Sequence, residues 1–129
     1  AEAVKVQDAM IICAPVISQM VGEAAGREAW DYPLTFHAEL RQRRDVLATS
    51  LRDAGLQWTP MAAGLFGLVR IPGRTDSKQL SLDLVERVHV VTIPGSAFGA
   101  SGEGYLRLSY GYAGVDDLRE AVRRIATVL

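Results

Sequence analysis

Hydrophobic residues recur at helical spacing through the first part of the chain. Six of them, all before Pro15, form two neighbouring stripes: Val4, Ile11 and Ile12, and Val6, Met10 and Cys13. Because the two stripes cover most of a helix circumference, the pattern predicts a helix over residues 1–14 that is covered on more than one side. The Cys13 thiol is therefore expected in an apolar core, where it would be unreactive.

A second and a third helix follow in the same pattern. Apolar residues repeat at spacings of three and four from Ile17 to Ala25, which favours a helix. Further along, Asp31 followed by Pro33 is typical of a helix start, and Gly55 is typical of a helix end.

The third predicted helix, residues 33–54, is long for a chain of 129 residues. Its expected core positions lie at spacings of seven, four and three: Leu40, Leu47, Leu51 and Ala54. A helix of about 22 residues spans roughly 33 Å, which is more than a small compact domain needs. The length therefore predicts that this helix connects two bodies.

The second half of the chain alternates between short apolar runs and amphipathic stretches. Three runs are typical of strands: 64–71, 89–93 and 105–110. Asp76 with Gln79 three residues later is typical of a helix start. The inward positions of that helix are expected to be Leu80, Leu84, Val85 and Val88, and those of a last helix from about residue 115 to be Val115, Leu118, Val122, Ile125 and Leu129. Helices followed by a small sheet with two covering helices predict an α/β fold of the α+β kind.

Composition and charge exclude several classes of protein. Hydrophobic residues make up 49% of the chain, and its formal net charge is −1. That charge provides no field to attract nucleic acid or an anionic membrane, and no run approaches the roughly 20 apolar residues of a membrane span. A single cysteine cannot form an internal disulfide, and no signal peptide is recognisable. We therefore expect a cytoplasmic protein that binds neither nucleic acid nor membranes.

Several kinds of site lack the residues that they need. The glycine-rich segment 95–104 leads into a predicted strand and not into a helix N-terminus, which argues against a phosphate-binding loop. His37 and His89 are far apart and have no further ligand at metal-binding spacing. The Gly-x-Ser-x-Gly motif of serine hydrolases is also missing from the sequence.

Arg107 is the strongest candidate for a binding residue. The period of two along the strand 105–110 puts Tyr105, Arg107 and Ser109 on one face and Leu106, Leu108 and Tyr110 on the other. A guanidinium on a rigid strand can offer two parallel hydrogen bonds to a carboxylate. The alternative, from the pattern alone, is an ordinary surface arginine on a half-exposed strand.

Three segments of the sequence resemble one family of enzymes. They are 91–99 (Val-Thr-Ile-Pro-Gly-Ser-Ala-Phe-Gly), 102–110 (Gly-Glu-Gly-Tyr-Leu-Arg-Leu-Ser-Tyr) and 60–66 (Pro-Met-Ala-Ala-Gly-Leu-Phe). Their spacing is similar to the C-terminal part of the pyridoxal-phosphate (PLP) aminotransferases of the aspartate aminotransferase type. Ser18 and Gln19, with the small-residue helix after them, resemble the segment ahead of that family's domain-spanning helix, so the resemblance covers nearly the whole chain.

The resemblance implies roles for individual residues. Arg107 matches the arginine that holds the α-carboxylate of the amino acid or 2-oxo acid in this family. Ser18 resembles a position near the dimer interface that approaches the cofactor phosphate of the other subunit, although Ser18 and Gln19 equally suit a helix cap. Phe98 and Gly99 resemble the loop at the active-site entrance, and they also suit a turn with ordinary packing.

Other parts of the family's site have no match in this sequence. These are the Schiff-base lysine in a Ser-x-x-Lys context, the Asp on the pyridinium nitrogen and the Arg on the phosphate; neither Lys5 nor Lys78 lies in a suitable context. The resemblance therefore implies a C-terminal fragment of a homodimeric enzyme, inactive alone, whose PLP is bound by a missing large domain. Residues 1–32 would be the tail of that domain, 33–54 the spanning helix and 55–129 the small domain. The alternative is a free-standing, non-catalytic α+β module that binds an amino acid or a protein partner.

Overall fold

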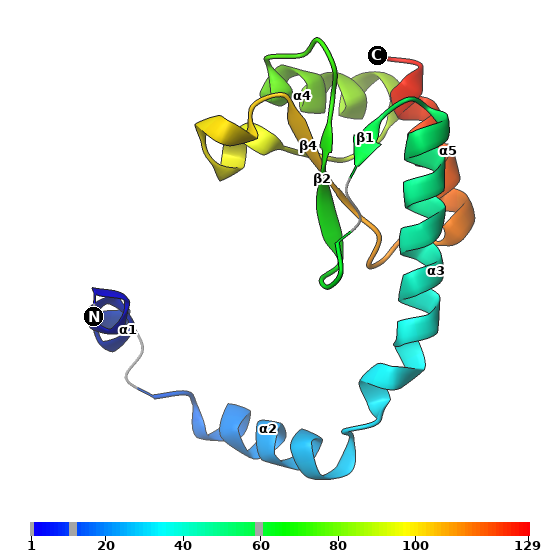
Figure 1. The fold of residues 1–129 in the computed structure, drawn as a ribbon. Helices are drawn as coiled ribbons and strands as arrows, with labels where there is room; N and C mark the ends of the chain where they lie inside the picture. The colour runs from blue at the N-terminus through cyan, green and yellow to red at the C-terminus, as the bar shows by residue number, and fades with distance from the viewer. Residues whose placement is uncertain (1, 11–12, 59–60) are drawn as a thin grey trace. The chain divides into compact units, whose positions relative to one another are not determined.

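The computed structural model describes residues 2–10, 13–58 and 61–129, and Figure 1 shows its ribbon. The chain divides into two units, residues 1–36 and 37–129. The first unit is helical, and the second combines helices with a small antiparallel sheet. This confirms the predicted fold class. In the part of the chain that the structure describes, no helix is both long and apolar enough to cross a membrane.

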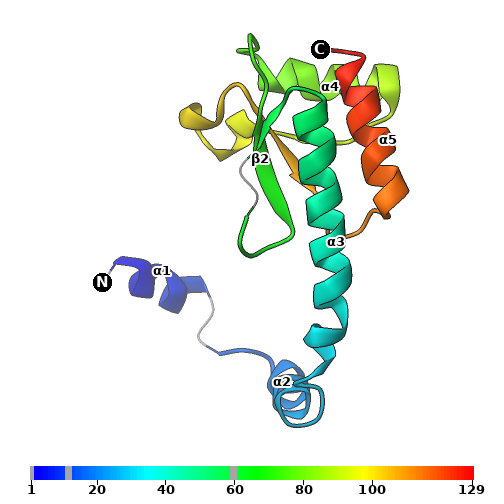
Figure 2. The ribbon, with the colours of Figure 1, turned by 45° about the vertical axis from the view of Figure 1, so that its right-hand side comes forward.

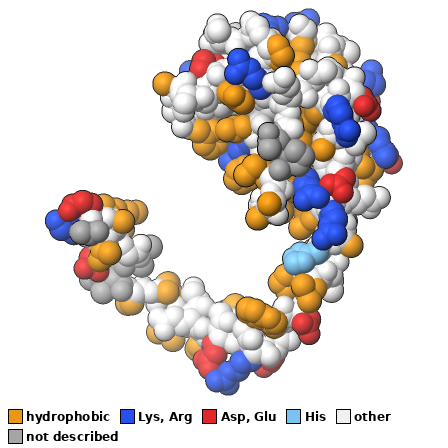
Figure 3. Space-filling view, in the orientation of Figure 1, with side chains coloured by type: hydrophobic (Ala, Val, Ile, Leu, Met, Phe, Trp, Pro, Cys, Tyr) orange, Lys and Arg blue, Asp and Glu red, His pale blue; other side chains and the backbone are white. Residues whose placement is uncertain are grey.

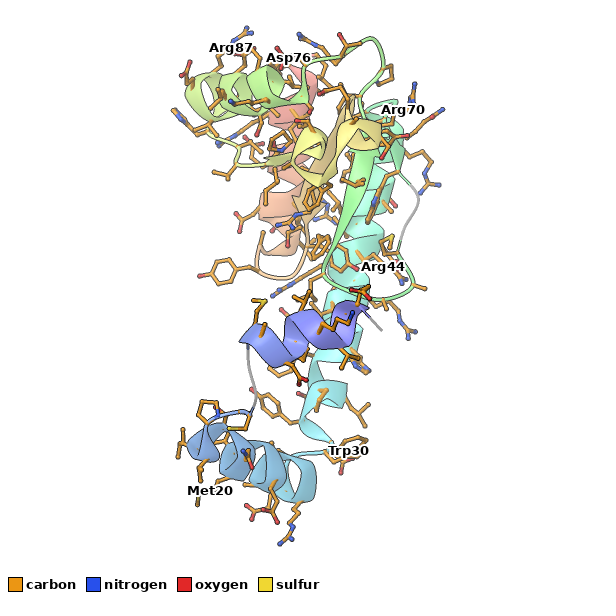
Figure 4. All side chains as sticks on the ribbon, turned by 90° about the vertical axis from the view of Figure 1, so that its left-hand side faces the viewer. Met20, Trp30, Arg44, Arg70, Asp76 and Arg87 are labelled. Carbon is orange, nitrogen blue, oxygen red and sulfur yellow. The ribbon has the colours of Figure 1, made fainter. Side chains whose placement is uncertain are left out.

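The first unit contains two short helices, α1 (Glu2–Met10) and α2 (Val16–Glu28). Neither helix has a buried residue, and large hydrophobic side chains such as Met20 and Trp30, labelled in Figure 4, are exposed. Cys13 is also exposed, so the prediction of a core cysteine is wrong. The physical reason is that two short helices do not form a covering layer for one another. Ile11 and Ile12 of the predicted stripe lie outside the described residues.

The third helix, α3 (Tyr32–Asp53), is continuous over 22 residues, as predicted. Its buried residues are Leu47 and Leu51. The helix ends before Gly55, whose φ of +74° is left-handed, and the Leu56 N–H then donates to Leu51 O at 2.8 Å. A glycine after the last turn allows this reversal without steric cost, which confirms the predicted stop.

Four short antiparallel strands form the sheet, in the order β1-β2-β4-β3. They are β1 (Gln57–Trp58), β2 (Phe66–Arg70), β3 (Ile93–Pro94) and β4 (Tyr105–Ser109). In the central pair, Leu68 lies opposite Arg107 and Val69 lies opposite Leu106. Val69 and Leu106 are fully buried, so they mark the inner face of the sheet, and the alternate residues mark the open face.

Helices cover the inner face of the sheet. Besides α3, they are α4 (Ser77–Val88) and α5 (Val115–Ala126). Figures 1 and 2 both show α3 and α5 side by side. The three helices contribute these residues to the core that also contains Val69, Leu106 and Leu108: Leu47, Leu51, Leu80, Leu84, Leu118, Val122 and Ile125. The core therefore lies on one side of the sheet.

The strand predicted over residues 89–93 is shorter than expected. Only Ile93–Pro94 pairs with β4. His89 instead ends α4 in the left-handed conformation, with φ 57°, and the Val90 N–H donates to Leu84 O at 3.1 Å. His89 and Val90, which the pattern assigned to the strand, therefore belong to the end of α4. The predicted core positions that are exposed instead are Ala54, Val85 and Leu129.

The segment between β3 and β4 folds back tightly on itself. It contains two 3-10 turns, η1 (Gly95–Phe98) and η2 (Ala100–Gly102). The backbones of Gly95 and Gly102 lie in direct contact. A Cβ on Gly95 would lie only 2.0 Å from Gly102 O and 2.7 Å from Tyr105 O. The segment continues into β4. Its glycines therefore permit close backbone approach and do not form a phosphate-binding helix start.

We predict that Gly95→Ala destabilises the second unit. Because the obstructing atoms are backbone oxygens, no side-chain rotation can make room for the methyl group, and overpacking of this kind costs about 1–3 kcal/mol. The matched control is Gly26→Ala in α2, where a Cβ would have nothing within 4 Å. Urea denaturation measures the free energy of unfolding of both variants. An unchanged value for Gly95→Ala would contradict the close backbone contact between Gly95 and Gly102.

Candidate functional site

Arg107 occupies the centre of the open face of the sheet. It is the middle residue of β4 and lies opposite Leu68 of β2 on one side and Ile93 of β3 on the other. Its chain neighbours Leu106 and Leu108 are buried in the core, so the side chain of Arg107 projects from the open face, as the alternation predicts. The residue is half-buried, and the strands on both sides fix its backbone.

Two aromatic rings lie against the guanidinium of Arg107. Its Cζ atom is 4.5 Å from the ring centroid of Phe66 and 5.4 Å from that of Phe98. An open hollow of about 410 Å³ surrounds this group, and its lining residues are Met61, Phe66, Gly67, Leu68, Phe98 and Arg107. In Figure 3, hydrophobic side chains gather between η1–η2 and β2. Cation–π contacts of this kind stabilise a guanidinium and leave N–H donors available to a ligand.

The two hydroxyls that share this face with Arg107 have other partners. Arg70 Nη1 donates to Tyr105 Oη at 3.4 Å, and the Arg70 guanidinium lies over the Tyr105 ring, 5.7 Å from its centroid. Ser109 Oγ donates to Leu65 O at 3.0 Å. The hydroxyls therefore lie on the predicted face, but the groups in contact with the Arg107 guanidinium are aromatic.

The charge of Arg107 is not paired within the part of the chain that the structure describes. Among the residues that the structure describes, it forms no ion pair with a carboxylate. The arginines of α5 differ, because Arg123 and Arg124 both bond to Glu120. Those bonds, the one from Arg123 first, lower the pKa of Glu120 to about 2. A half-buried cation without an anionic partner is suited to a carboxylate ligand.

The family resemblance implied Phe98 at the active-site entrance, with a turn and ordinary packing as the alternative, and it did not indicate Phe66 as a neighbour of Arg107. Phe98 is the last residue of η1, and Gly99, with φ +110°, turns the chain toward η2. Phe66 reaches Arg107 diagonally across the strand pair, since Phe66 lies opposite Ser109. The alternation along β2 already puts Phe66 and Leu68 on one face, but only the register between β2 and β4 brings that face to Arg107.

Ser18 lies in the first unit, whereas Arg107 lies in the second. Ser18 is an exposed residue near the start of α2, where its N–H donates to Pro15 O at 2.9 Å. Gln19 Nε2 donates to Ala14 O at 2.7 Å. Both residues therefore take part in the start of a helix, and a contact of Ser18 with a cofactor stays a prediction.

Metal-binding groups and lysines were the other candidate ligands in the sequence. No group of three or more His, Cys, Asp or Glu that could hold a metal ion is found among these residues. Lys5 is exposed on α1 and pairs with Glu2, and Lys78 is exposed on the first turn of α4. Lys78, which is in the same unit as Arg107, does not line the hollow around it.

We predict a measurable coupling between Arg107 and Phe66. A double-mutant cycle with Arg107→Met and Phe66→Leu should give an interaction free energy of about 0.5–1 kcal/mol, because each variant removes one side of a cation–π contact. The control cycle replaces Arg107→Met with Arg87→Met, an exposed arginine on α4, and should be additive. Urea denaturation supplies the four free energies; additivity in the Arg107 cycle would disprove the contact.

Comparisons with known proteins place the chain in a family. The model of the family "Aminotransferase class I and II" matches residues 3–125. The LL-diaminopimelate aminotransferase of Nitratidesulfovibrio vulgaris (strain DP4) is 36% identical over 115 residues, which cover 85% of this chain and 29% of that protein. The aromatic-amino-acid aminotransferase 2 of Thermococcus litoralis is 33% identical over 102 residues, which cover 78% of this chain and 26% of that protein.

A solved structure agrees with these relatives. The crystal structure of the aromatic aminotransferase from Pyrococcus horikoshii OT3 matches with a TM-score of 0.70 and 34% sequence identity, over 78% of this chain and 27% of that chain. The chain thus spans less than a third of the length of each of these three proteins. On the family match over residues 3–125, the chain belongs to the class I and II aminotransferases.

Proposed function

We propose that this chain is the C-terminal part of a longer PLP-dependent aminotransferase, which moves an amino group between an amino acid and a 2-oxo acid. Membership of the family supports the proposal, as do the names of the relatives. Because the chain spans less than a third of those relatives, most of the catalytic machinery would lie outside it. The contribution proposed for this chain is the binding of substrate by Arg107.

The observation that carries this role is the guanidinium of Arg107, which lies on an apolar open face and has no ion-pair partner among the described residues. Phe66 and Phe98 lie against the guanidinium and reduce its contact with water, which strengthens its attraction for an anion. Its planar fork can then donate two parallel hydrogen bonds to the α-carboxylate that every amino acid and 2-oxo acid substrate carries. Such a pair of bonds orients the substrate as well as binding it, and orientation is itself a source of rate acceleration.

PLP is the cofactor that the proposal requires, and when bound it withdraws electrons from the α-carbon of the substrate. Among the described residues, the lining of the hollow around Arg107 includes no lysine that could hold it. We therefore assign PLP binding to a large domain outside the chain, with Ser18 approaching the cofactor phosphate of the partner subunit in a homodimer.

In this proposal the chain has three parts. Residues 1–32 are the tail of the large domain, 33–54 the spanning helix and 55–129 the small domain. The exposed hydrophobic side chains of α1 and α2 support the first assignment, because such surfaces are normally covered in a folded enzyme. The chain alone would be inactive, and the full-length enzyme would be cytoplasmic.

A second candidate is a free-standing, non-catalytic module that binds an amino acid or a protein partner. It is favoured by an arginine that is suited to bind a carboxylate, in a hollow whose described lining residues include no lysine. The reading frame upstream of Ala1 separates the two candidates. An in-frame Ser-x-x-Lys and Gly-x-Arg supports the enzyme, whereas a start codon at that point supports the module.

In the full-length enzyme, we predict that Arg107→Lys lowers kcat/KM roughly 30- to 1000-fold. Lysine keeps the charge but cannot form two parallel hydrogen bonds to one carboxylate, and a loss of about 2–4 kcal/mol corresponds to that fall. Steady-state kinetics with the best amino acid substrate measure the effect, with Arg87→Lys on α4 as the control. A value within about threefold of the unmodified enzyme would make Arg107 an ordinary surface residue.

The chain by itself should form no specific covalent adduct with PLP. Its lysines, Lys5 and Lys78, are exposed, and neither lies in the Ser-x-x-Lys context of the family's Schiff-base lysine. After incubation with PLP, borohydride reduction and peptide mass spectrometry should reveal only partial labelling spread over several amines. Complete labelling of a single lysine would contradict the assignment of cofactor binding to another domain.

A further inference from the structure

The loop that brings Phe98 to Arg107 is attached to a separate element, the start of α4. Both ends of the loop converge there on Ser77, the first residue of α4, which is 1% exposed. Figure 4, in which Asp76 marks the start of α4, shows this end of the helix beside η1 and η2. The contacts of Ser77 therefore determine how firmly the loop is held.

The entry of the loop is attached through a pair of hydroxyls. Ser77 Oγ donates to Ser96 Oγ at 3.0 Å and accepts from the Ser96 N–H at 3.2 Å. Ser96 lies in η1, two residues before Phe98. Because Ser77 is buried, its hydroxyl is shielded from water, and these bonds fix the backbone before Phe98 to α4.

The exit of the loop is attached through a carboxylate. Glu103 Oε1 accepts from the Ser77 N–H at 2.6 Å and from the Gly104 N–H at 3.0 Å. These bonds, the one from Ser77 first, lower the pKa of Glu103, so the group is ionised at neutral pH. The Ser77 N–H is one of the helix-start donors without an acceptor inside the helix, and a negative charge is favourable at this position.

The backbone of the loop has little conformational freedom between these two attachments. Gly95 and Gly102 cross in backbone contact, and Gly104 O accepts from the Ile71 N–H at 2.8 Å, which ties the loop exit to the end of β2. Arg107 follows Glu103 by four residues, on the strand that the loop enters. A displacement of either attachment is therefore transmitted to the ring of Phe98.

We infer that Ser77 and Glu103 are positioning residues for Arg107, an inference that rests on the proposed function of Arg107. Neither residue touches the guanidinium. By holding both ends of the loop they keep Phe98 over Arg107, and Phe98 with Phe66 restricts the guanidinium to the orientation in which its paired donors meet a carboxylate. A loosened loop lets the guanidinium rotate, which weakens substrate binding more than it slows the later chemical steps.

The experiment has two readouts. In this chain, the Nε–H resonance of Arg107, assigned by its loss in Arg107→Lys, reports through ring currents whether Phe98 lies over the guanidinium. In the full-length enzyme, KM and kcat are measured with one amino acid substrate. The variants are Glu103→Ala, Ser77→Ala and the conservative Glu103→Gln, which keeps an acceptor oxygen, with Glu86→Ala on the exposed side of α4 as the matched control.

We expect Glu103→Ala and Ser77→Ala to move the Arg107 resonance toward that of an arginine without ring neighbours. KM should rise about tenfold while kcat changes less than about threefold, because binding loses an oriented, charge-assisted contact. Glu103→Gln should stay within about threefold of the unmodified enzyme in KM, and Glu86→Ala should change neither readout.

The outcomes separate this inference from the proposed function. If Arg107→Lys leaves kcat/KM unchanged, the proposed function fails, whatever the Ser77 and Glu103 variants do. If Arg107→Lys lowers kcat/KM but the two alanine variants fold and leave KM or the resonance unchanged, the inference is overturned and the proposed function stands. Where Glu103→Ala does not fold, Ser77→Ala decides, and failure of both to fold assigns the contacts to stability alone and likewise overturns the inference.

Discussion

The register between β2 and β4 is the constraint on which the rest of the second unit depends. With Val69 opposite Leu106, the apolar residues of both strands face the helices, and with Leu68 opposite Arg107, the arginine faces the other way. A slip of one residue would turn Leu106 outward and bury Arg107 in the core. Burial of an unpaired guanidinium is strongly unfavourable, so the same interaction that builds the core also sets the direction of the Arg107 side chain.

The helical side of the sheet and the open side are linked through the start of α4. Leu80 and Leu84 of α4 pack in the core, while Ser77 at its first turn holds the loop that carries Phe98 on the open side. The glycines make this link possible, because a Cβ on Gly95 or Gly102 would overlap backbone atoms of the other. The packing of α4 against the inner face of the sheet is in this way connected to the surroundings of Arg107 on the open face.

Elements whose signal is local could be predicted from the sequence, and contacts between distant segments could not. The alternation over Tyr105–Ser109 gave the face of Arg107, and the Asp76 cap is present, with its carboxylate accepting from the Gln79 N–H at 2.9 Å. Phe66 as a neighbour of Arg107 depends on strand register, and the left-handed end of α4 at His89 depends on how the helix meets the sheet, so neither has a local signal. The core position assigned to Cys13 failed for a related reason, since amphipathic spacing indicates a face to be covered but not what covers it.

The open face also explains how the sheet tolerates an arginine without an anion. Full burial of such a charge would cost several kcal/mol, on the order of the entire stability of a small domain. Arg107 is half-buried, so water still reaches part of the guanidinium while Phe66 and Phe98 lie against it. Arg123 and Arg124, by contrast, are already satisfied by Glu120 and have little to gain from a ligand. In the proposed function, a carboxylate that displaces the remaining water at Arg107 would gain a charge-assisted bond at a small desolvation cost, a gain that Arg123 and Arg124 do not offer.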